Sequence, residues 1–353
     1  MRVAVTGAAG FLGLNLVRLL AGDGHDVVAI DRVAPVVEPV EAHPGVSTGS
    51  TTGNGSTRGN GSSAGGTVSW LAADVLDQQA MTEAFRDVEV VFHLVALISL
   101  KQEDPLAWRV NTEGVSTVAR AALAADVRRM VNCGSLASFH YERHGTVDEE
   151  SPRAVDPRLP VYHRSKYAGE VALAEVVDQG LDALTCNPTG IFGPADNPAR
   201  LSRMNASLLD AARGRAPVAV AGAFDMVDVR DVAHGFILAA EKGRTGQNYL
   251  LSGHRARLDT VVRLAAESAG RRGPLVTLPV RVLEALQPLV DPIAQRFGSD
   301  QFAAAALENL TMSPRVDGSK AAAELGFVPR PIEQTVRDLV GFFRAEGLLA
   351  GSR

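Results

Sequence analysis

A glycine-rich turn limits the possible folds of this 353-residue chain more than any other feature. The stretch "VTGAAGFLG" places Gly7, Gly10 and Gly13 between the β-branched run "RVAVT" and the helical pattern "FLGLNLVRLLAGDG". Gly7 permits a tight turn, Gly10 lets the backbone approach a pyrophosphate, and Gly13 allows the helix to pack closely on the strand. The free N–H groups at the helix N-terminus favour phosphates. The pattern therefore predicts a dinucleotide site rather than a glycine-rich turn without a ligand.

Short apolar runs alternate with longer helical patterns through much of the chain. These runs are continuous, as expected for strands that are buried on both faces of a parallel sheet. They are "RVAVT", "HDVVAID", "EVVFHLVAL", "VRRMVNCGS" and "LDALTCNPTGIFGP". The alternation predicts an α/β fold with a doubly wound parallel sheet of the Rossmann type and helices on both faces.

The chain is expected to divide into two domains. Residues 1–185 are predicted to form the dinucleotide-binding Rossmann domain, and residues 186–353 a smaller, mostly helical substrate-binding region. Roughly 226–252 are expected to return to the Rossmann domain, because "QNYLLSG" resembles one more strand.

The C-terminal part contains three helical patterns, around 257–269, 279–297 and 331–347. Pro288 and Pro292 interrupt the middle pattern, so this helix is expected to be bent or split. Its amphipathic character favours a lid over a pocket, with a helix on a membrane surface as the alternative.

Residues 45–66, "GVSTGSTTGNGSTRGNGSSAGG", consist almost entirely of Gly, Ser, Thr and Asn. Such a segment has no apolar surface to offset the entropy lost on ordering. The sequence predicts a flexible insertion between the second and third strands.

Composition argues against several other classes of protein. A net charge of -5 gives no electrostatic footprint for nucleic acid. No apolar run approaches the roughly 18 residues of a membrane span. Cys133 and Cys186 lie in apolar runs without metal-ligand spacing, which predicts reduced thiols and no metal site. The N-terminus enters a strand at once, without signal-peptide features. We expect a cytoplasmic, soluble protein.

Acidic residues after the second and third strands bear on the choice of cofactor. Asp31 ends "HDVVAID", where a carboxylate can accept hydrogen bonds from both adenosine ribose hydroxyls and would repel a 2′-phosphate. NAD is therefore expected, with NADP less favoured because Arg32 could turn toward such a phosphate. Asp74 is placed either to meet the adenine edge or to cap the next helix.

Tyr162 and Lys166 lie four residues apart in the helical segment "PVYHRSKYAGEVALAE", so they share one face of the helix. A free tyrosine has a pKa of about 10, and a nearby cation lowers that pKa by stabilising the phenolate. The phenol can then exchange a proton with a substrate oxygen. Lys166 could also hold the hydroxyls of the nicotinamide ribose. Without the glycine turn, the pair would be interpreted as two residues of a solvated surface.

Ser135 and Asn111 complete the candidate catalytic group. Ser135 follows the strand that ends near Cys133, at the sheet edge where open α/β folds bind ligands. Its hydroxyl could bind a substrate carbonyl or alcohol, or belong to an ordinary turn. Asn111 lies within a predicted helix, where it could hold a proton-relaying water near Lys166 or have a purely structural role.

Together these residues resemble the extended short-chain dehydrogenase/reductase family of the NAD-dependent epimerase/dehydratase type. The matching features are "TGAAGFLG", Asp31, Asp74, "HLVA" at 93–96, Ser135 and "YHRSK". The resemblance implies catalysis by Ser135, Tyr162 and Lys166, assisted by Asn111, and a homodimer. Its implied cofactor-binding residues are Gly7, Ala9, Gly10, Phe11, Leu12, Gly13, Asp31, Arg32, Asp74, Val75, Leu94, Val95, Ala96, Tyr162, Lys166, Pro188 and Thr189.

The segment "CNPTGIFGP" resembles dihydroflavonol reductase-like and steroid dehydrogenase-like members of this family. "SLA" follows the active-site strand where nucleotide-sugar dehydratases usually carry an Asp-Glu pair, which argues against dehydration. Arg200, Arg203 and Arg230 could serve a nucleotide diphosphate.

Three functions follow from these observations. The first is an NAD(P)-dependent oxidoreductase that acts on a secondary alcohol or ketone of a small-molecule substrate, with Tyr162 as general acid or base. The alternatives are a nucleotide-sugar epimerase with tightly bound NAD and a non-catalytic dinucleotide-sensing protein.

Overall fold

The computed structural model of the protein describes residues 1–33, 65–141, 145–279, 282 and 314–349. The predicted flexible insertion at 45–66 lies outside the described residues except for its last two positions. The predicted middle helix at 279–297, with Pro288 and Pro292, also lies almost wholly outside them.

A seven-stranded parallel sheet forms the larger part of the molecule. Its strand order is β11-β7-β5-β4-β1-β2-β3, and every neighbouring pair is parallel. The order reverses at the boundary between β1 and β4, so ligands are expected at the carboxyl ends of these strands. The strands are β1 (Arg2–Thr6), β2 (Asp26–Asp31), β3 (Val68–Ala72), β4 (Val90–His93), β5 (Arg129–Cys133), β7 (Ala183–Pro188) and β11 (Asn248–Leu251).

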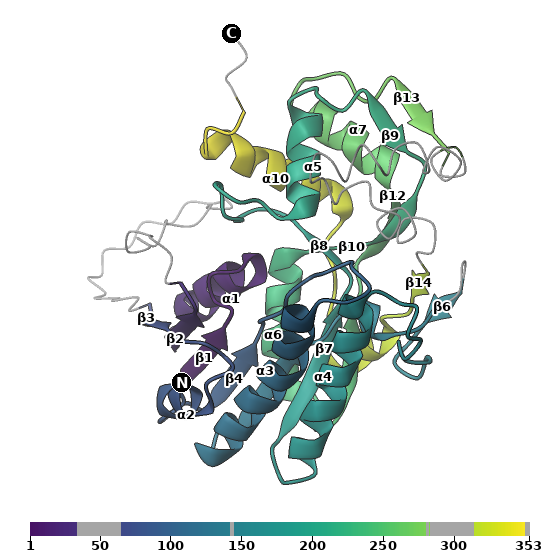
Figure 1. Ribbon diagram of the computed structural model, residues 1–353. Coiled ribbons are helices and arrows are strands. Elements are labelled where there is room, and N and C mark those ends of the chain that lie inside the picture. The colour runs from purple at the N-terminus through teal and green to yellow at the C-terminus, as the bar shows by residue number, and fades with distance from the viewer. Residues whose placement is uncertain (34–64, 142–144, 280–281, 283–313, 350–353) are drawn as a thin grey trace, which may run out of the picture.

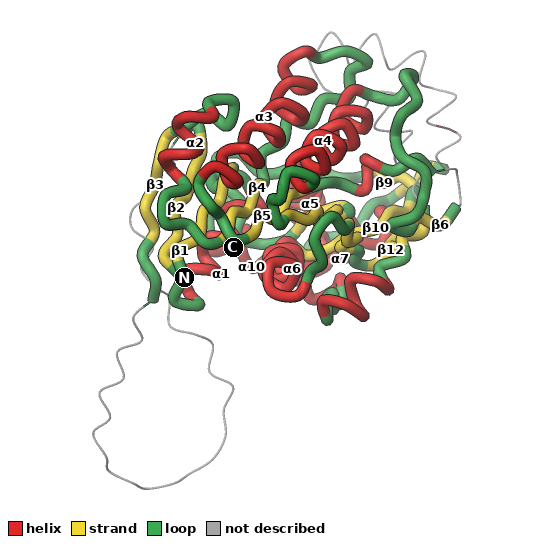
Figure 2. The backbone as a smooth tube through the Cα atoms, turned by 90° about the horizontal axis from the view of Figure 1, so that it is seen from below, coloured by secondary structure: helices red, strands yellow, loops and turns green. Residues whose placement is uncertain are grey.

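Helices cover both faces of this sheet (Figure 2). α1 (Phe11–Gly22) and α6 (Val229–Lys242) share one apolar cluster with the strands, and α2 (Gln78–Ala84), α3 (Pro105–Ala124) and α4 (Val161–Val177) share another. The central strands are buried on both sides, which explains why their sequences are continuously apolar. The predicted doubly wound Rossmann fold is confirmed.

A smaller region lies beyond the carboxyl ends of the strands (Figure 1). Its core is formed by α5 (Arg203–Ala212), α7 (Leu258–Ser268) and α10 (Ile332–Ala345). The helices predicted around 257–269 and 331–347 are α7 and α10. Short strands accompany the helices: β8 (Gly190–Phe192), β10 (Ala223–Asp228) and β12 (His254–Arg257) form one sheet, and β9 (Val218–Val220) pairs with β13 (Val276–Leu278).

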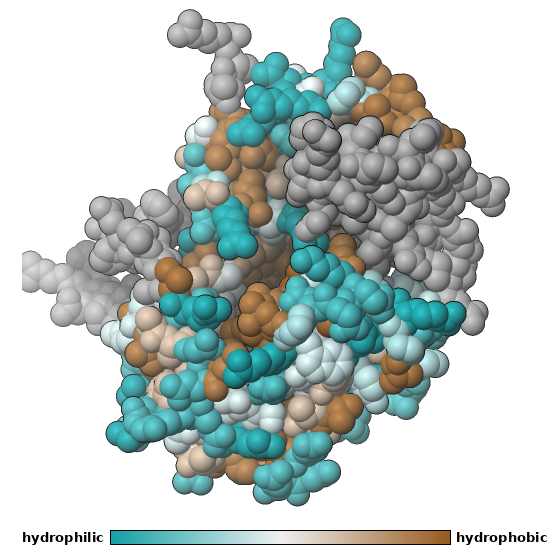
Figure 3. All heavy atoms as spheres, viewed as in Figure 1, coloured by the Kyte–Doolittle hydropathy of each residue, from teal (hydrophilic) through white to brown (hydrophobic). Residues whose placement is uncertain are grey.

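The chain crosses between the two regions more than once. β10 belongs to the small sheet, whereas the following α6 and β11 pack on and join the large one. β6 (Thr146–Val147) pairs with β14 (Arg315–Val316) at the side of the junction. The space-filling view is hollowed between the two regions, with hydrophobic residues inside the hollow (Figure 3). In the part of the chain that the structure describes, no helix is long and apolar enough to cross a membrane.

Candidate active site

The turn between β1 and α1 has the geometry expected of a phosphate cradle. Gly7 adopts a φ of +75°, and a Cβ at this position would lie 3.0 Å from the backbone nitrogen of Val95. A Cβ on Gly13 would lie 2.2 Å from the carbonyl oxygen of Gly7, so only glycine fits. The first N–H groups of α1 have no acceptor within the helix and are available to an anion. These features fit the pyrophosphate of a dinucleotide.

Asp31 lies beside this turn at the end of β2. Its Oδ2 accepts a hydrogen bond from the N–H of Ala9 at 3.1 Å, and its Oδ1 accepts from the N–H of Arg32 at 2.8 Å. Both oxygens keep lone pairs for further donors, as contact with ribose hydroxyls requires. The side chain of Arg32 lies 3.8 Å from Asp74, but this pair is too exposed to fix either side chain strongly.

The structure decides one of the two alternatives for Asp74. Asp77 is the residue that caps α2, because its Oδ1 accepts a hydrogen bond from the N–H of Ala80 at 3.0 Å. Asp74 instead accepts from the N–H of Leu76 in the preceding turn, at 3.0 Å. The helix-cap alternative is therefore wrong, and contact with adenine stays a prediction. Val75 beside it is buried in the core.

The segment after β4 borders the glycine turn. The N–H of Leu94 donates to the carbonyl of Thr6 at 3.0 Å, and Val95 faces Gly7. This places the predicted cofactor-binding residues Leu94–Ala96 next to the turn. His93, just before them, is buried and bonded through Nδ1 to Thr6 Oγ1 at 2.7 Å. Burial lowers the pKa of His93 to about 3, so this imidazole is neutral.

Asn111 holds the loop that follows β4. Its Oδ1 accepts from the N–H of Leu97 at 2.9 Å, while its Nδ2 donates to the carbonyl of Leu97 and to Ser165 Oγ, each at 3.0 Å. The side chain is 1% exposed. Both amide hydrogens are already used, so Asn111 has a structural role in this loop, and the water-holding role stays a prediction.

Ser135 and Tyr162 come together at the carboxyl edge of the large sheet. Ser135 follows β5, and Tyr162 lies in the first turn of α4. Both side chains line the same cavity, and the Ser135 side chain is one of the groups that lower the pKa of the phenol. Ser135 Oγ also accepts from the N–H of Ala137 at 3.1 Å, which fixes the orientation of the serine. The pair can thus present two adjacent hydroxyls to one substrate oxygen.

One expectation about Lys166 is not met. Lys166 is 3% exposed, and its Nζ donates to the carbonyl of Cys133 at 2.5 Å. Burial raises the pKa of Tyr162 to about 12, and Lys166 is not among the groups that lower it. The predicted lowering of the Tyr162 pKa by Lys166 is therefore wrong for this structure. For the pKa of Tyr162, the effect of burial outweighs any effect of the Lys166 charge. Burial also lowers the pKa of Lys166.

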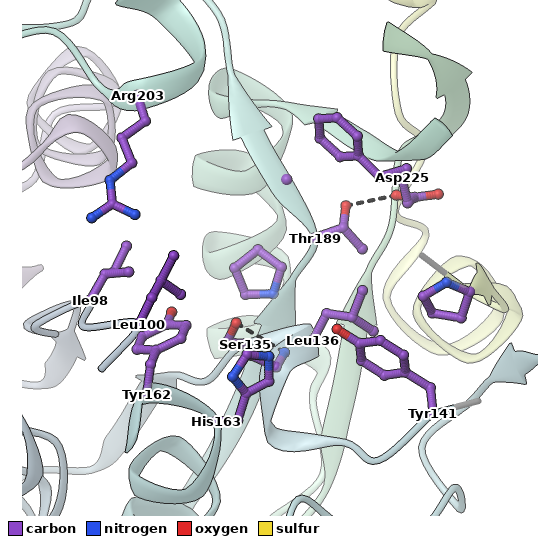
Figure 4. A pocket seen from close by; sticks show the side chains of 15 residues that line it. Ile98, Leu100, Ser135, Leu136, Tyr141, Tyr162, His163, Thr189, Arg203 and Asp225 are labelled. Carbon is purple, nitrogen blue, oxygen red and sulfur yellow. Dashed lines mark hydrogen bonds between the residues drawn. The ribbon is translucent and has the colours of Figure 1, made fainter. Parts of the chain in front are cut away.

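A cavity of about 330 Å³ opens above Ser135 and Tyr162 (Figure 4). Pro188 and Thr189, predicted as cofactor contacts, line it, and Thr189 Oγ1 donates to Asp225 Oδ1 at 2.7 Å. Most of the remaining wall is apolar and comes from several distant segments: Ile98, Leu100, Leu136, Ala137, Phe224 and Pro314.

The three candidate arginines do not converge. Arg203 lines the cavity, whereas Arg230 is paired with Asp228 at 2.6 Å and with Asp338 at 2.8 Å. Arg200 does not contribute to the cavity wall. The described residues therefore do not assemble the arginine set considered for a nucleotide diphosphate.

Sequence reasoning missed two residues on α4. His163 lines the cavity, and burial lowers its pKa to about 4. Glu170 accepts from Ser138 Oγ at 2.6 Å and from Asn187 Nδ2 at 2.7 Å, and it lies 3.2 Å from Arg153. Glu170 stands four residues after Lys166, so helical spacing alone could have placed it on the catalytic face.

Comparison with known proteins agrees with this geometry. The sequence profile of the NAD dependent epimerase/dehydratase family matches residues 3–252. The chain belongs to this family. It is thus an enzyme of the extended short-chain dehydrogenase/reductase type, as the motifs indicated.

Several known proteins resemble this chain over nearly its whole length. Sterol demethylase protein B of Methylococcus capsulatus is 30% identical over 355 residues, which cover 99% of this chain and all of that protein. A putative dihydroflavonol 4-reductase of Synechocystis is 26% identical over 97% of this chain and 94% of its own length. The crystal structure of gox2253 superposes with a TM-score of 0.76 at 27% identity, covering 98% of this chain and 99% of that one.

Proposed function

We propose that this enzyme transfers a hydride between NAD and the carbon of a secondary alcohol or ketone on a bulky, largely apolar substrate. The observation that carries the proposal is the cavity, which presents Ser135 and Tyr162 within a mainly apolar wall. A sugar nucleotide would need many polar partners there, whereas an apolar ring system needs only shape and one anchored oxygen. Similarity to a sterol demethylase protein supports the same choice.

The residues of the region built around the large sheet fit NAD. The backbone of the Gly7–Gly13 turn would hold the pyrophosphate, and the Asp31 carboxylate would hold the adenosine ribose and disfavour NADP. Asp74 and Val75 are proposed to border the adenine, and Leu94–Ala96, Lys166, Pro188 and Thr189 the nicotinamide half. This assigns residues 1–185 to the cofactor and most of 186–353 to the substrate.

Bound NAD would supply the hydride acceptor at the nicotinamide ring, and the chain's residues would position the substrate and handle the proton. Ser135 would hold the substrate oxygen, and Tyr162 would share or transfer its proton. A phenol with a pKa of about 12 is protonated at neutral pH, so it is ready to donate. When an alcohol is oxidised, the same phenol would act in its deprotonated form and accept the proton.

The two alternatives receive less support. An epimerase that acts on a nucleotide sugar would need cationic contacts for the diphosphate, and Arg203 is the one arginine that lines the described cavity. A non-catalytic sensor would have no use for a serine and a tyrosine that line the same cavity.

A substrate screen tests the proposal. The full-length protein is mixed with NAD and either 2-decalol, a 3β-hydroxysteroid or UDP-glucose, and NADH formation is followed by absorbance. We expect turnover of the apolar alcohols, with Tyr162→Phe slower by about 10²- to 10⁴-fold and with unchanged NADH binding. Tyr167→Phe, on the same helix, is the matched control.

Normal turnover by the Tyr162→Phe variant would disprove the assigned role of this tyrosine. Epimerisation of UDP-glucose by protein that retains NAD through gel filtration would favour the epimerase instead.

A homodimer through α3 and α4 is a further part of the proposal, made because the family resemblance implies it. Trp108, Val155 and Val171 on this side are 40%, 69% and 44% exposed. Light scattering should give twice the chain mass for the wild type and the mass of one chain for Val171→Glu. The cytoplasmic location stays a prediction.

A further inference from the structure

Arg203 is a cation at the rim of the catalytic cavity. It is the first residue of α5, and its guanidinium points toward Ile98 and Tyr162 (Figure 4). Its charge acts on the phenol, because it is one of the influences that lower the pKa of Tyr162. The guanidinium therefore lies near the place where the substrate oxygen must bind.

No carboxylate pairs with Arg203 in the ranges that the structure describes. Other arginines of the same region do have such partners: Arg230 pairs with Asp228 and Asp338, and Arg257 pairs with Asp259 at 2.8 Å. Asp196, just before α5, accepts instead from the N–H of Ser202 at 2.7 Å and from Asn205 at 2.8 Å.

The position of Arg203 in its helix is also electrostatically unfavourable. A helix N-terminus carries a partial positive charge, so a cation in the first turn has an electrostatic cost. α5 has no acidic residue in its first turn to offset this cost. An anionic ligand bound to Arg203 would offset it.

The other charged group in the cavity wall, Asp225, already accepts hydrogen bonds from neighbouring residues. Asp225 is 5% exposed, and its Oδ1 accepts from Thr189 and from the N–H of Gly253, each at 2.7 Å. His163 is neutral at physiological pH. Around Tyr162 the described cavity thus offers one unpaired positive charge among apolar side chains.

We propose that Arg203 binds a carboxylate of the substrate, so that the enzyme selects hydroxy or oxo acids whose carboxylate lies close to the reacting carbon. A guanidinium fork matches a carboxylate with two parallel hydrogen bonds, whereas the apolar wall takes the rest of the molecule. This assignment rests on the proposed function, because it names the class of alcohol that the same site oxidises.

Binding can be measured separately from turnover. The full-length enzyme, loaded with NADH, is titrated with cyclohexanecarboxylate and with the uncharged cyclohexanecarboxamide by calorimetry. We expect the carboxylate to bind more tightly than the amide and Arg203→Gln to weaken carboxylate binding about 10- to 100-fold. Arg203→Lys should lie between the wild type and Arg203→Gln, and the exposed control Arg200→Gln should match the wild type.

Turnover is then measured with 2-hydroxycyclohexanecarboxylate and its methyl ester. The wild type should prefer the acid in kcat/KM, and Arg203→Gln should lose this preference, because its kcat/KM falls much more for the acid than for the ester. If carboxylate binding depends on Arg203 but neither alcohol is oxidised, the proposed dehydrogenase function fails and the binding site stands.

Three results would overturn the assignment of Arg203. The first is equal binding of the acid and the amide by the wild type, or no binding of the acid. The second is an equal loss of both ligands in Arg203→Gln. The third is binding of UDP that depends on Arg203 and exceeds that of the carboxylate, since the site would then take a diphosphate.

Discussion

The two ends of the active site are built in different ways. The cofactor end is made mainly of backbone, where Gly7 and Gly13 leave room for atoms that a Cβ would overlap. The substrate end is made of side chains from α4, α5, β10 and the loops after β4 and β5. A phosphate cradle made of backbone tolerates almost no substitution, but it can serve enzymes with different substrates. A cavity wall made of side chains can change while the catalytic residues stay the same.

The largest expected effect is at the cofactor end. Gly13→Ala would place a Cβ 2.2 Å from the carbonyl oxygen of Gly7, and backbone cannot give way as a side chain does. We expect a loss of about 3 kcal/mol or more in the free energy of unfolding, together with loss of NADH binding. Urea unfolding and NADH fluorescence measure the two effects. Gly22→Ala, in the same helix and with open space around it, should be close to neutral.

Asn111 lies where the two ends meet. Asn111→Ala removes three hydrogen bonds, to Leu97 and to buried Ser165, and should cost about 1–3 kcal/mol of unfolding free energy. Turnover should fall in parallel as the loop after β4 loosens. Thr112→Ala, on the exposed side of the same helix, serves as the control. Unchanged stability with a large drop in kcat would instead support a proton relay through Asn111.

One buried histidine lies near each end of the active site, so the pH dependence of stability can be compared between the two ends. Burial lowers the pKa of His93 to about 3 and that of His163 to about 4, below the ordinary 6.5. As the pH falls below 6.5, the unfolded chain takes up protons that the folded chain does not, so the folded state loses stability. Each histidine should contribute a loss of about 1.4 kcal/mol per pH unit down to its folded pKa.

Urea unfolding between pH 7.5 and 5.5 measures this slope. His163→Asn should remove the contribution of one histidine from this slope. A slope that His163→Asn does not alter would show that burial does not lower the pKa of this imidazole in the folded protein.

The smallest expected effect concerns the choice of cofactor. Asp31→Asn keeps an acceptor for the N–H of Ala9 but removes the charge that would repel a 2′-phosphate. The ratio of kcat/KM for NAD to that for NADP should fall about 5- to 10-fold. Asp74→Asn, which alters the other acid near Arg32, should change this ratio much less. Equal effects of the two variants would mean that the total charge, and not contact with the ribose, selects NAD.

Sequence patterns alone predicted the parallel sheet, the glycine turn and the shared helical face of Tyr162 and Lys166. These features follow from spacing along the chain, which local geometry converts directly into structure. The three-dimensional structure was needed to show that Asp77 and not Asp74 caps α2, and that Arg203 and not Arg230 reaches the cavity. It was also needed to show that burial raises the pKa of Tyr162. The burial of an ionisable side chain and the choice of its partner depend on which distant segments come into contact. A pattern within one segment does not encode these contacts.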